Sequence, residues 1–324
     1  MYDLDEFQSL PVTEVARIMR EAGPKVCGFP INGTRRWFAL EHSEEALGGH
    51  LAYMRCAGDR TIEVCKMIFD HGVDTLLIPI FGPAVAARGP DYQPLIEPGL
   101  RWFASDPAML EFYDAYDVQV RLYGDGRRVY PDYSAAWDAF DRVAERTAHH
   151  RRHRLFYGAC ADDPTETVAK IAVQFHQAQG QLPDKRQIIE AYYGSYVEPL
   201  SFCIGFEPMA MFDLPLIASG TEDLYFTVSP SLYLDESTLR SILYDHLYTR
   251  RTHDNYSIFT SADWSAIDQF YRLNRRHVLG LGRQAAWGGW WYPLPQVLLP
   301  NELMNDPVVF ADKESSQTDA LESP

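Results

Sequence analysis

Short apolar runs of strand length recur along this chain, and amphipathic stretches with helical spacing separate them. The runs lie at residues 25–30, 75–81, 118–123, 154–160, 201–206 and 224–229. In the intervening stretches apolar residues return every three or four positions, as at Val168, Ile171 and Phe175 and again over residues 239–247. Such spacing places them on one face of a helix. The alternation predicts an α/β fold in which helices flank a mostly parallel central sheet on both faces.

The first of these strands ends in a turn that carries two adjacent arginines. Residues 26–38 read VCGFPINGTRRWF. In a parallel sheet, ligands bind beyond the carboxyl ends of the strands, and the turn Asn32–Arg36 follows one of these ends. Arg35 and Arg36 present planar N–H forks that match phosphate oxygens, while Gly33 lets the backbone approach a ligand closely. The turn therefore predicts an anion site.

The same two arginines also suit a solvated turn that binds no ligand. Glu41, Glu44 and Glu45 follow closely and offer local ion-pair partners. On residue types alone this alternative is the stronger one, because short motifs occur often by chance.

Tyr53 and Tyr92 are candidates for the same edge of the sheet. Tyr53 opens a helical stretch after the arginine turn, and Tyr92 follows a loop, broken by glycine and proline, after the strand that ends at Phe81. A phenol at this edge can stabilise a cation through its ring or orient a water molecule. An ordinary aromatic residue half-buried under a loop is the simpler explanation of each position.

Local structure explains two further motifs. Residues 162–166, DDPTE, have the DDxxE form of a magnesium–diphosphate site, but Asp163 as an N-cap, Pro164 in the first turn and Glu166 in a capping box account for them. The run His149–Arg154 is rich in histidine and arginine, yet adjacent histidines do not share a helix face and no nearby carboxylate completes a metal site. We expect a solvated helix end there.

Length and composition predict one globular domain followed by a polar tail. The chain has 324 residues, and no linker stands out before residue 295, so we expect a single domain over residues 1–295. Residues 296–324 are acidic and polar and have little to bury. We expect them to form a flexible tail.

The net charge of −16, from 29 basic and 45 acidic side chains, argues against nucleic acid or an anionic membrane as a partner. An anionic ligand must therefore be bound by a local basic cluster. The five cysteines form no CxxC pair, which is typical of reduced thiols. No apolar segment has the length of a membrane span and the N-terminus is acidic, so we expect a cytoplasmic protein.

The arginine turn and several other motifs resemble the cis-prenyltransferase superfamily, in which a DGNxRW turn follows the first strand and an ELYFT strand lies in the C-terminal half. Here NGTRRW (32–37) and DLYFT (223–227) stand in the same order. The chain is most similar to a divergent branch, the diterpene synthases of the tuberculosinol synthase and kolavelool synthase type. The motifs shared with that branch between about residues 5 and 292 include GPKV (23–26), PIF (79–81), YGD (123–125), FDLPL (212–216) and ILYDH (242–246).

This resemblance implies a cis-prenyltransferase fold and a C20 allylic diphosphate substrate, usually a bicycle made by a separate class II diterpene cyclase. It implies an enzyme that ionises a kolavenyl- or tuberculosinyl-type diphosphate, releases diphosphate and captures the cation with water to give a diterpene alcohol. Preorganised arginines and amides stabilise such a leaving group, and the cation needs a dry apolar pocket. By the same resemblance the diphosphate is bound by Gly33, Thr34, Arg35 and Arg36, and the cation is flanked by Tyr53 and Tyr92.

Two departures from the superfamily pattern narrow this prediction. The arginine-bearing motif that holds a second diphosphate is replaced by IGFEP at residues 204–208, so condensation with isopentenyl diphosphate is not expected. Asn32 stands where the superfamily has aspartate, and an amide is a weaker ligand for a hard cation. The resemblance implies Mg²⁺, which we expect to be held mainly by the diphosphate oxygens, and it keeps Asn32 among the catalytic candidates.

Two alternatives to the diterpene alcohol synthase stay open. The same cation can be captured by a nucleoside or another acceptor, which makes the protein a prenyl transferase. The loss of aspartate at position 32 also suits a non-catalytic subunit that supports a prenyltransferase partner. For each reading we expect a homodimer.

Overall fold

A computed structural model describes residues 2–293 apart from 44–48, 83–84, 86, 90–91, 161–162, 208, 212–213, 251–258 and 285–290. The predicted tail at residues 296–324 lies outside the described residues, so the division of the chain at residue 295 stays a prediction.

Six parallel strands form the central sheet, in the order β3-β4-β2-β1-β5-β6. They are β1 (Val26–Gly28), β2 (Thr75–Phe81), β3 (Val118–Tyr123), β4 (His153–Ala159), β5 (Phe202–Phe206) and β6 (Asp223–Thr227). Each lies on one of the predicted apolar runs, which confirms the predicted fold class. Because all six run the same way, their carboxyl ends meet at one edge of the sheet.

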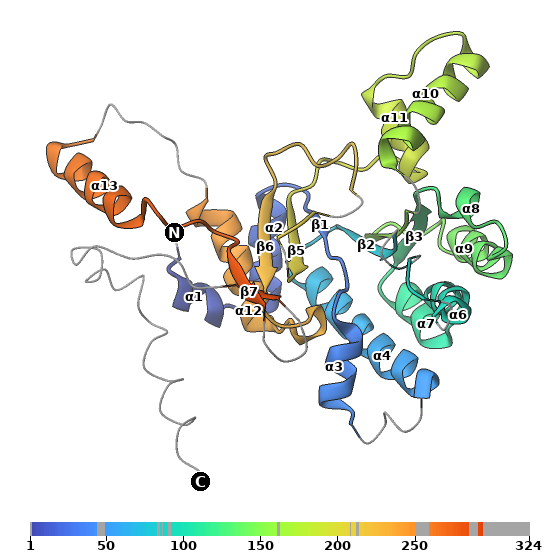
Figure 1. The fold of residues 1–324 in the computed structure, drawn as a ribbon, viewed down its shortest axis with the longest axis horizontal. Coiled ribbons are helices and arrows are strands. Elements are labelled where there is room, and N and C mark those ends of the chain that lie inside the picture. The colour runs from blue at the N-terminus through green and yellow to red at the C-terminus, as the bar shows by residue number, and fades with distance from the viewer. Residues whose placement is uncertain are drawn as a thin grey trace.

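Helices cover both faces of this sheet (Figure 1). Successive strand residues point to opposite faces, so Leu76 packs into the larger core and Leu77 into the smaller one. The larger core holds residues of α1 (Leu4–Ser9), α2 (Val12–Glu21), α4 (Gly49–Asp70), α6 (Gln93–Ser105), α7 (Pro107–Ala115), α9 (Ser134–Arg146) and α12 (Glu236–Tyr244). On the other face α11 (Lys185–Tyr193) contributes buried residues to the smaller core, and α10 (Pro164–Gln179) packs against α11. The shorter helices are α3 (Thr34–Glu41), α8 (Gly126–Val129) and η2 (Ser231–Tyr233).

The structure corrects details of both motifs that local structure was expected to explain. Asp163 does cap α10 by accepting a hydrogen bond from the Thr165 amide at 2.7 Å, but Glu166 pairs with Lys170 and closes no capping box. Asp162 lies outside the described residues. The His149–Arg154 run is no solvated helix end, because it leads into β4 and buries His150 and His153.

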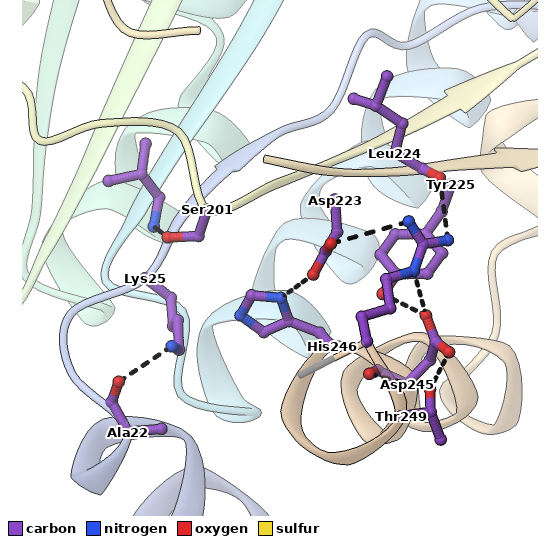
Figure 2. Close-up of polar contacts among 11 residues, drawn as sticks. Ala22, Lys25, Ser201, Asp223, Leu224, Tyr225, Asp245, His246 and Thr249 are labelled. Carbon is purple, nitrogen blue, oxygen red and sulfur yellow. Dashed lines mark hydrogen bonds and ion pairs between the residues drawn. The ribbon is translucent and has the colours of Figure 1, made fainter. Parts of the chain in front are cut away.

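A polar cluster anchors the helical turn that follows α12 to the amino end of β6 (Figure 2). Asp223 is hydrogen-bonded to His246 Nδ1 at 2.6 Å, and the Tyr225 hydroxyl donates to Asp245 at 2.7 Å. The Arg250 guanidinium lies 4.5 Å from the centre of the Tyr225 ring. Asp245 and His246 come from η3 (Asp245–Thr249), a π-helical turn. The cluster lies at the opposite end of the sheet from the arginine turn, so it supports the fold rather than the candidate site.

Beyond this cluster, α13 (Ser261–Asn274) lies apart from the sheet (Figure 1). A separate antiparallel pair joins β7 (Gly282–Gln284) to β8 (Trp291–Pro293). Within the described part of the chain, no helix is long and apolar enough to cross a bilayer.

Candidate functional site

The arginine turn is a helix N-terminus placed at the carboxyl edge of the sheet. Gly33 precedes α3 with a φ of 73°, and a Cβ there would lie 2.6 Å from Cε1 of Phe206. Both the left-handed backbone and the close contact therefore require glycine. Among the described residues no side chain caps α3, so the amides of its first turn are available to an anion and the helix dipole favours one.

The two arginines point to different sides of this helix start. The Arg35 guanidinium lies 5.3 Å from the centre of the Tyr92 ring, and that of Arg36 lies 5.0 Å from the centre of the Phe206 ring. Arg36 also forms an ion pair with Glu207. Glu41, expected as a local partner of the arginines, instead accepts a hydrogen bond from Tyr233 at 2.6 Å. Glu44 and Glu45, the other expected partners, lie outside the described residues.

Tyr53 and Tyr92 stand beside this turn. The hydroxyl of Tyr53, on α4, is hydrogen-bonded to Thr34 Oγ1 at 2.6 Å. Burial raises the pKa of Tyr53, and the nearby Arg35 and Arg88 oppose this only in part. The phenol is therefore neutral at pH 7. Tyr92 precedes α6, and the centre of its ring is 5.3 Å from the Arg35 guanidinium and 4.5 Å from that of Arg88.

One cavity of about 780 Å³ joins these groups. All seven predicted residues line it, namely Asn32, Gly33, Thr34, Arg35, Arg36, Tyr53 and Tyr92. Its volume lies within the range of about 300–1,000 Å³ that is typical of small-molecule sites. The structure thus brings the predicted residues together, while their roles stay predictions.

The inner part of the cavity is apolar and lies between α4 and α6. Met54 and Ala57 line it from α4, and Ile96, Leu100 and Phe103 line it from α6. The cavity therefore combines cationic and amide donors with a large hydrocarbon and aromatic surface.

The Trp102 indole crosses from α6 to the backbone of α4. A Cβ at Gly58 would lie 2.0 Å from its Cζ2, so only glycine leaves room for the ring. Both residues line the cavity, and their contact limits its width between the two helices.

Two titratable lining residues, Arg88 and His50, were missing from the sequence prediction. Arg88 lies four positions before Tyr92 in the same glycine- and proline-broken loop, which carries no periodic signal. His50 lies three positions before Tyr53 on α4, so helical spacing from Tyr53 could have identified it. Within the described part of the chain, His50 Nε2 is buried without a hydrogen-bond partner.

The described lining includes no aspartate or glutamate, and the described residues contain no group of three acidic, histidine or cysteine side chains able to hold a metal. Mg²⁺ prefers carboxylate and phosphate oxygens and keeps several waters. The residues present therefore do not fit a protein-held Mg²⁺, and Asn32 contributes only an amide at this point.

Two curated relatives match nearly the whole chain. The tuberculosinyl adenosine transferase of Mycobacterium tuberculosis is 38% identical over 282 residues, which are 86% of this chain and 94% of the relative. The (+)-kolavelool synthase of Herpetosiphon aurantiacus is 29% identical over 297 residues, which are 90% of this chain and 95% of the relative. No family model matches the chain.

Two solved structures share the fold of this chain. The lavandulyl diphosphate synthase of Lavandula x intermedia, solved with dimethylallyl diphosphate, superposes with a TM-score of 0.54 at 13% identity over 72% of this chain and 98% of that one. A probable undecaprenyl diphosphate synthase from Campylobacter jejuni gives 0.52 at 15% identity over 70% and 97%. The chain therefore belongs to the family of the tuberculosinyl adenosine transferase, and its fold is that of the cis-prenyltransferases.

Proposed function

We propose that this protein ionises a bicyclic C20 allylic diphosphate and transfers the diterpenyl group to an organic acceptor such as a nucleoside. The observation that carries the proposal is the cavity itself, which joins an uncapped helix N-terminus and three arginines to an apolar chamber. The 38% identity to a tuberculosinyl adenosine transferase favours an organic acceptor over water.

In the first step the bond between the allylic carbon and the diphosphate oxygen breaks, and the electron pair leaves with the oxygen. Negative charge on the diphosphate then grows. The first-turn amides of α3 and the forks of Arg35, Arg36 and Arg88 are the groups we assign to it. Donors fixed before the reaction stabilise such charge by several kcal/mol, because they need not reorganise.

In the second half of the reaction the cation must be protected from capture by water until the acceptor attacks. The apolar residues between α4 and α6 exclude water, and the ring faces of Tyr53 and Tyr92 are assigned to stabilise the positive charge. A lone pair of the acceptor then forms the new bond to carbon. When the attacking atom carries a proton, we assign its acceptance to His50 Nε2.

Capture by water is the second candidate, and the similarity to a kolavelool synthase favours it. The product would then be a diterpene alcohol. Both readings share the diphosphate site and differ only in the acceptor. For both, we propose that a class II diterpene cyclase supplies the substrate, that the chain acts as a homodimer, and that Mg²⁺ is held by the diphosphate.

The test is incubation of the purified chain with bicyclic C20 allylic diphosphates and Mg²⁺, with and without adenosine. We expect diphosphate release and, by mass spectrometry, a diterpenyl–nucleoside adduct. An alcohol as the sole product in both incubations would select the water reading. Unchanged substrate with a folded protein would refute both readings and support a non-catalytic subunit.

A further inference from the structure

Glu207 holds one of the two turn arginines from a neighbouring strand. It follows β5 directly, and β5 is hydrogen-bonded to β1, the strand that leads into the arginine turn. Its carboxylate accepts a hydrogen bond from Nη1 of Arg36. The pairing raises the pKa of Arg36, which keeps the guanidinium charged.

Arg36 would have many conformations without this contact. Its side chain is 47% exposed, and a long exposed arginine loses rotamer entropy when it is fixed. Phe206 lies under the guanidinium and is itself packed against Gly33. Ring and carboxylate together therefore fix Arg36 relative to the start of α3.

The backbone of Glu207 argues that its side chain has a specific use. Its φ is +66°, in the left-handed region that glycine occupies without cost and other residues rarely adopt. A strained non-glycine residue beside a candidate site indicates a function for its side chain.

The pairing leaves donors on Arg36 for a ligand. Glu207 occupies Nη1, whereas a guanidinium carries five N–H groups. The remaining N–H groups can face a phosphate while the carboxylate stays bound. The ion pair therefore need not break when a diphosphate enters.

From these contacts we propose that Glu207 is a positioning residue that orients Arg36 toward the departing diphosphate. The inference rests on the proposed function for its chemistry. Glu207 acts through Arg36 and lowers the barrier to bond cleavage. It does not contribute to the ground-state affinity for the diphosphate, because a carboxylate repels that anion.

Glu207→Gly is the decisive variant, because glycine relieves the backbone while removing the carboxylate. We expect no lower melting temperature, yet about a tenfold slower single-turnover cleavage, as preorganisation is lost. Inorganic pyrophosphate should bind equally well or more tightly by calorimetry. Leu216→Gly is the matched control, since Leu216 also has a positive φ, of 70°, and does not line the cavity. Its cleavage rate should stay at the wild-type value.

The double variant Glu207→Gly/Arg36→Ala distinguishes a positioning role of Glu207 from a general structural role. If Glu207 acts through Arg36, adding Glu207→Gly to Arg36→Ala should change the cleavage rate less than about twofold. Independent effects that multiply would overturn the inference, as would an unchanged rate in Glu207→Gly alone.

Pyrophosphate binding separates this inference from the proposed function. If the wild-type protein shows no turnover, the proposed function is refuted. The coupling between Glu207 and Arg36 is then measured from the pyrophosphate affinities of the variants. We expect Arg36→Ala to weaken pyrophosphate binding more when Glu207→Gly is also present, because Nη1 of Arg36, which Glu207 otherwise occupies, is then free to donate to the anion. The same loss in both backgrounds would overturn the role of Glu207.

Discussion

Each of the three arginines at this cavity is held against an aromatic ring. Arg35 and Arg88 both lie near the Tyr92 ring, and Arg36 lies over Phe206. Stacking on a ring uses the face of the guanidinium and leaves the N–H groups at its edge for a ligand. The arrangement therefore fixes cationic forks without using up the donors that a diphosphate needs.

Replacing Arg88 tests whether this third arginine belongs to the leaving-group site. For Arg88→Ala we expect diphosphate release to slow by about 10–100-fold, because one preorganised donor set is lost. Arg88→Lys should recover only part of the rate, since a lysine is a point charge without a fork. Arg127, which pairs with Asp141 and does not line the cavity, gives the control variant Arg127→Ala. Full recovery by lysine would show that charge alone matters.

Asn32 offers a second test at the level of a single side chain. In Asn32→Asp a carboxylate enters a lining that, over the described residues, contains none. With pyrophosphate present, we expect Mg²⁺ to bind about tenfold more tightly by calorimetry, because Mg²⁺ prefers carboxylate to amide oxygen. Asn32→Ala should bind Mg²⁺ as the wild type does. A magnesium titration that aspartate leaves unchanged would place this side chain away from the metal.

The helices α4 and α6, which line the apolar chamber, contact each other at Gly58. Trp102 of α6 lies on the backbone of α4 at Gly58. Alanine favours a helix by about 1 kcal/mol over glycine. At this position the added methyl group must displace the indole, and such overpacking costs about 1–3 kcal/mol.

Gly58→Ala should therefore alter the chamber more than the fold. We expect turnover of a bicyclic C20 diphosphate to fall at least tenfold, with a smaller loss for a C15 diphosphate, because the displaced ring narrows the cavity. Trp102→Phe in the same chain should restore part of the C20 activity, since the smaller ring makes room for the methyl. Equal losses for both substrates without such rescue would mean that Gly58 affects stability alone. Competition assays between the two diphosphates measure the preference.

Prediction from sequence succeeds for elements and local turns and fails for what depends on packing. Runs such as TLLIPIF at 75–81 define strands because they are apolar and short and are bounded by polar or turn-forming residues, here Asp74 and Gly82. The order of the six strands follows from tertiary packing and has no local signal. The arginine turn could be placed at the carboxyl edge of the sheet, because the position of a loop after a strand fixes its edge. The place of Arg88 in the site and the Glu207–Arg36 pair could not be predicted, because they depend on which distant loops meet in the fold.

Across the whole molecule, the strongly acidic surface contrasts with the basic site. The net charge is −16, and the three arginines converge on one cavity. Salt at physiological strength screens charges beyond about 8 Å. An anion is therefore attracted only close to the site, which suits a substrate recognised by a short diphosphate and a large hydrocarbon.

The stability of the whole fold should also depend on a buried histidine at the start of β4. The side chain of His153 is 1% exposed and stacks on Phe69 with ring centres 4.4 Å apart. Burial, aided by Arg152 and Arg20, lowers the pKa of His153 from 6.5 to about 4. Between these values the unfolded chain binds the proton and the folded chain does not, so stability falls as the pH drops below 6.5.

Between pH 7 and pH 5 this one histidine should cost about 2 kcal/mol of the free energy of unfolding. His153→Phe keeps an aromatic ring against Phe69 and removes the titration, so its loss of stability over the same interval should be smaller by that amount. Urea unfolding at both pH values measures the difference. His71, whose pKa is likewise lowered by burial, changes stability in the same direction and remains in both proteins. His71 and the carboxylates are common to the wild type and the variant, so the pH dependence of the two stabilities differs only through His153. If both proteins lost the same stability between pH 7 and pH 5, the His153 imidazole would be protonated in the folded protein.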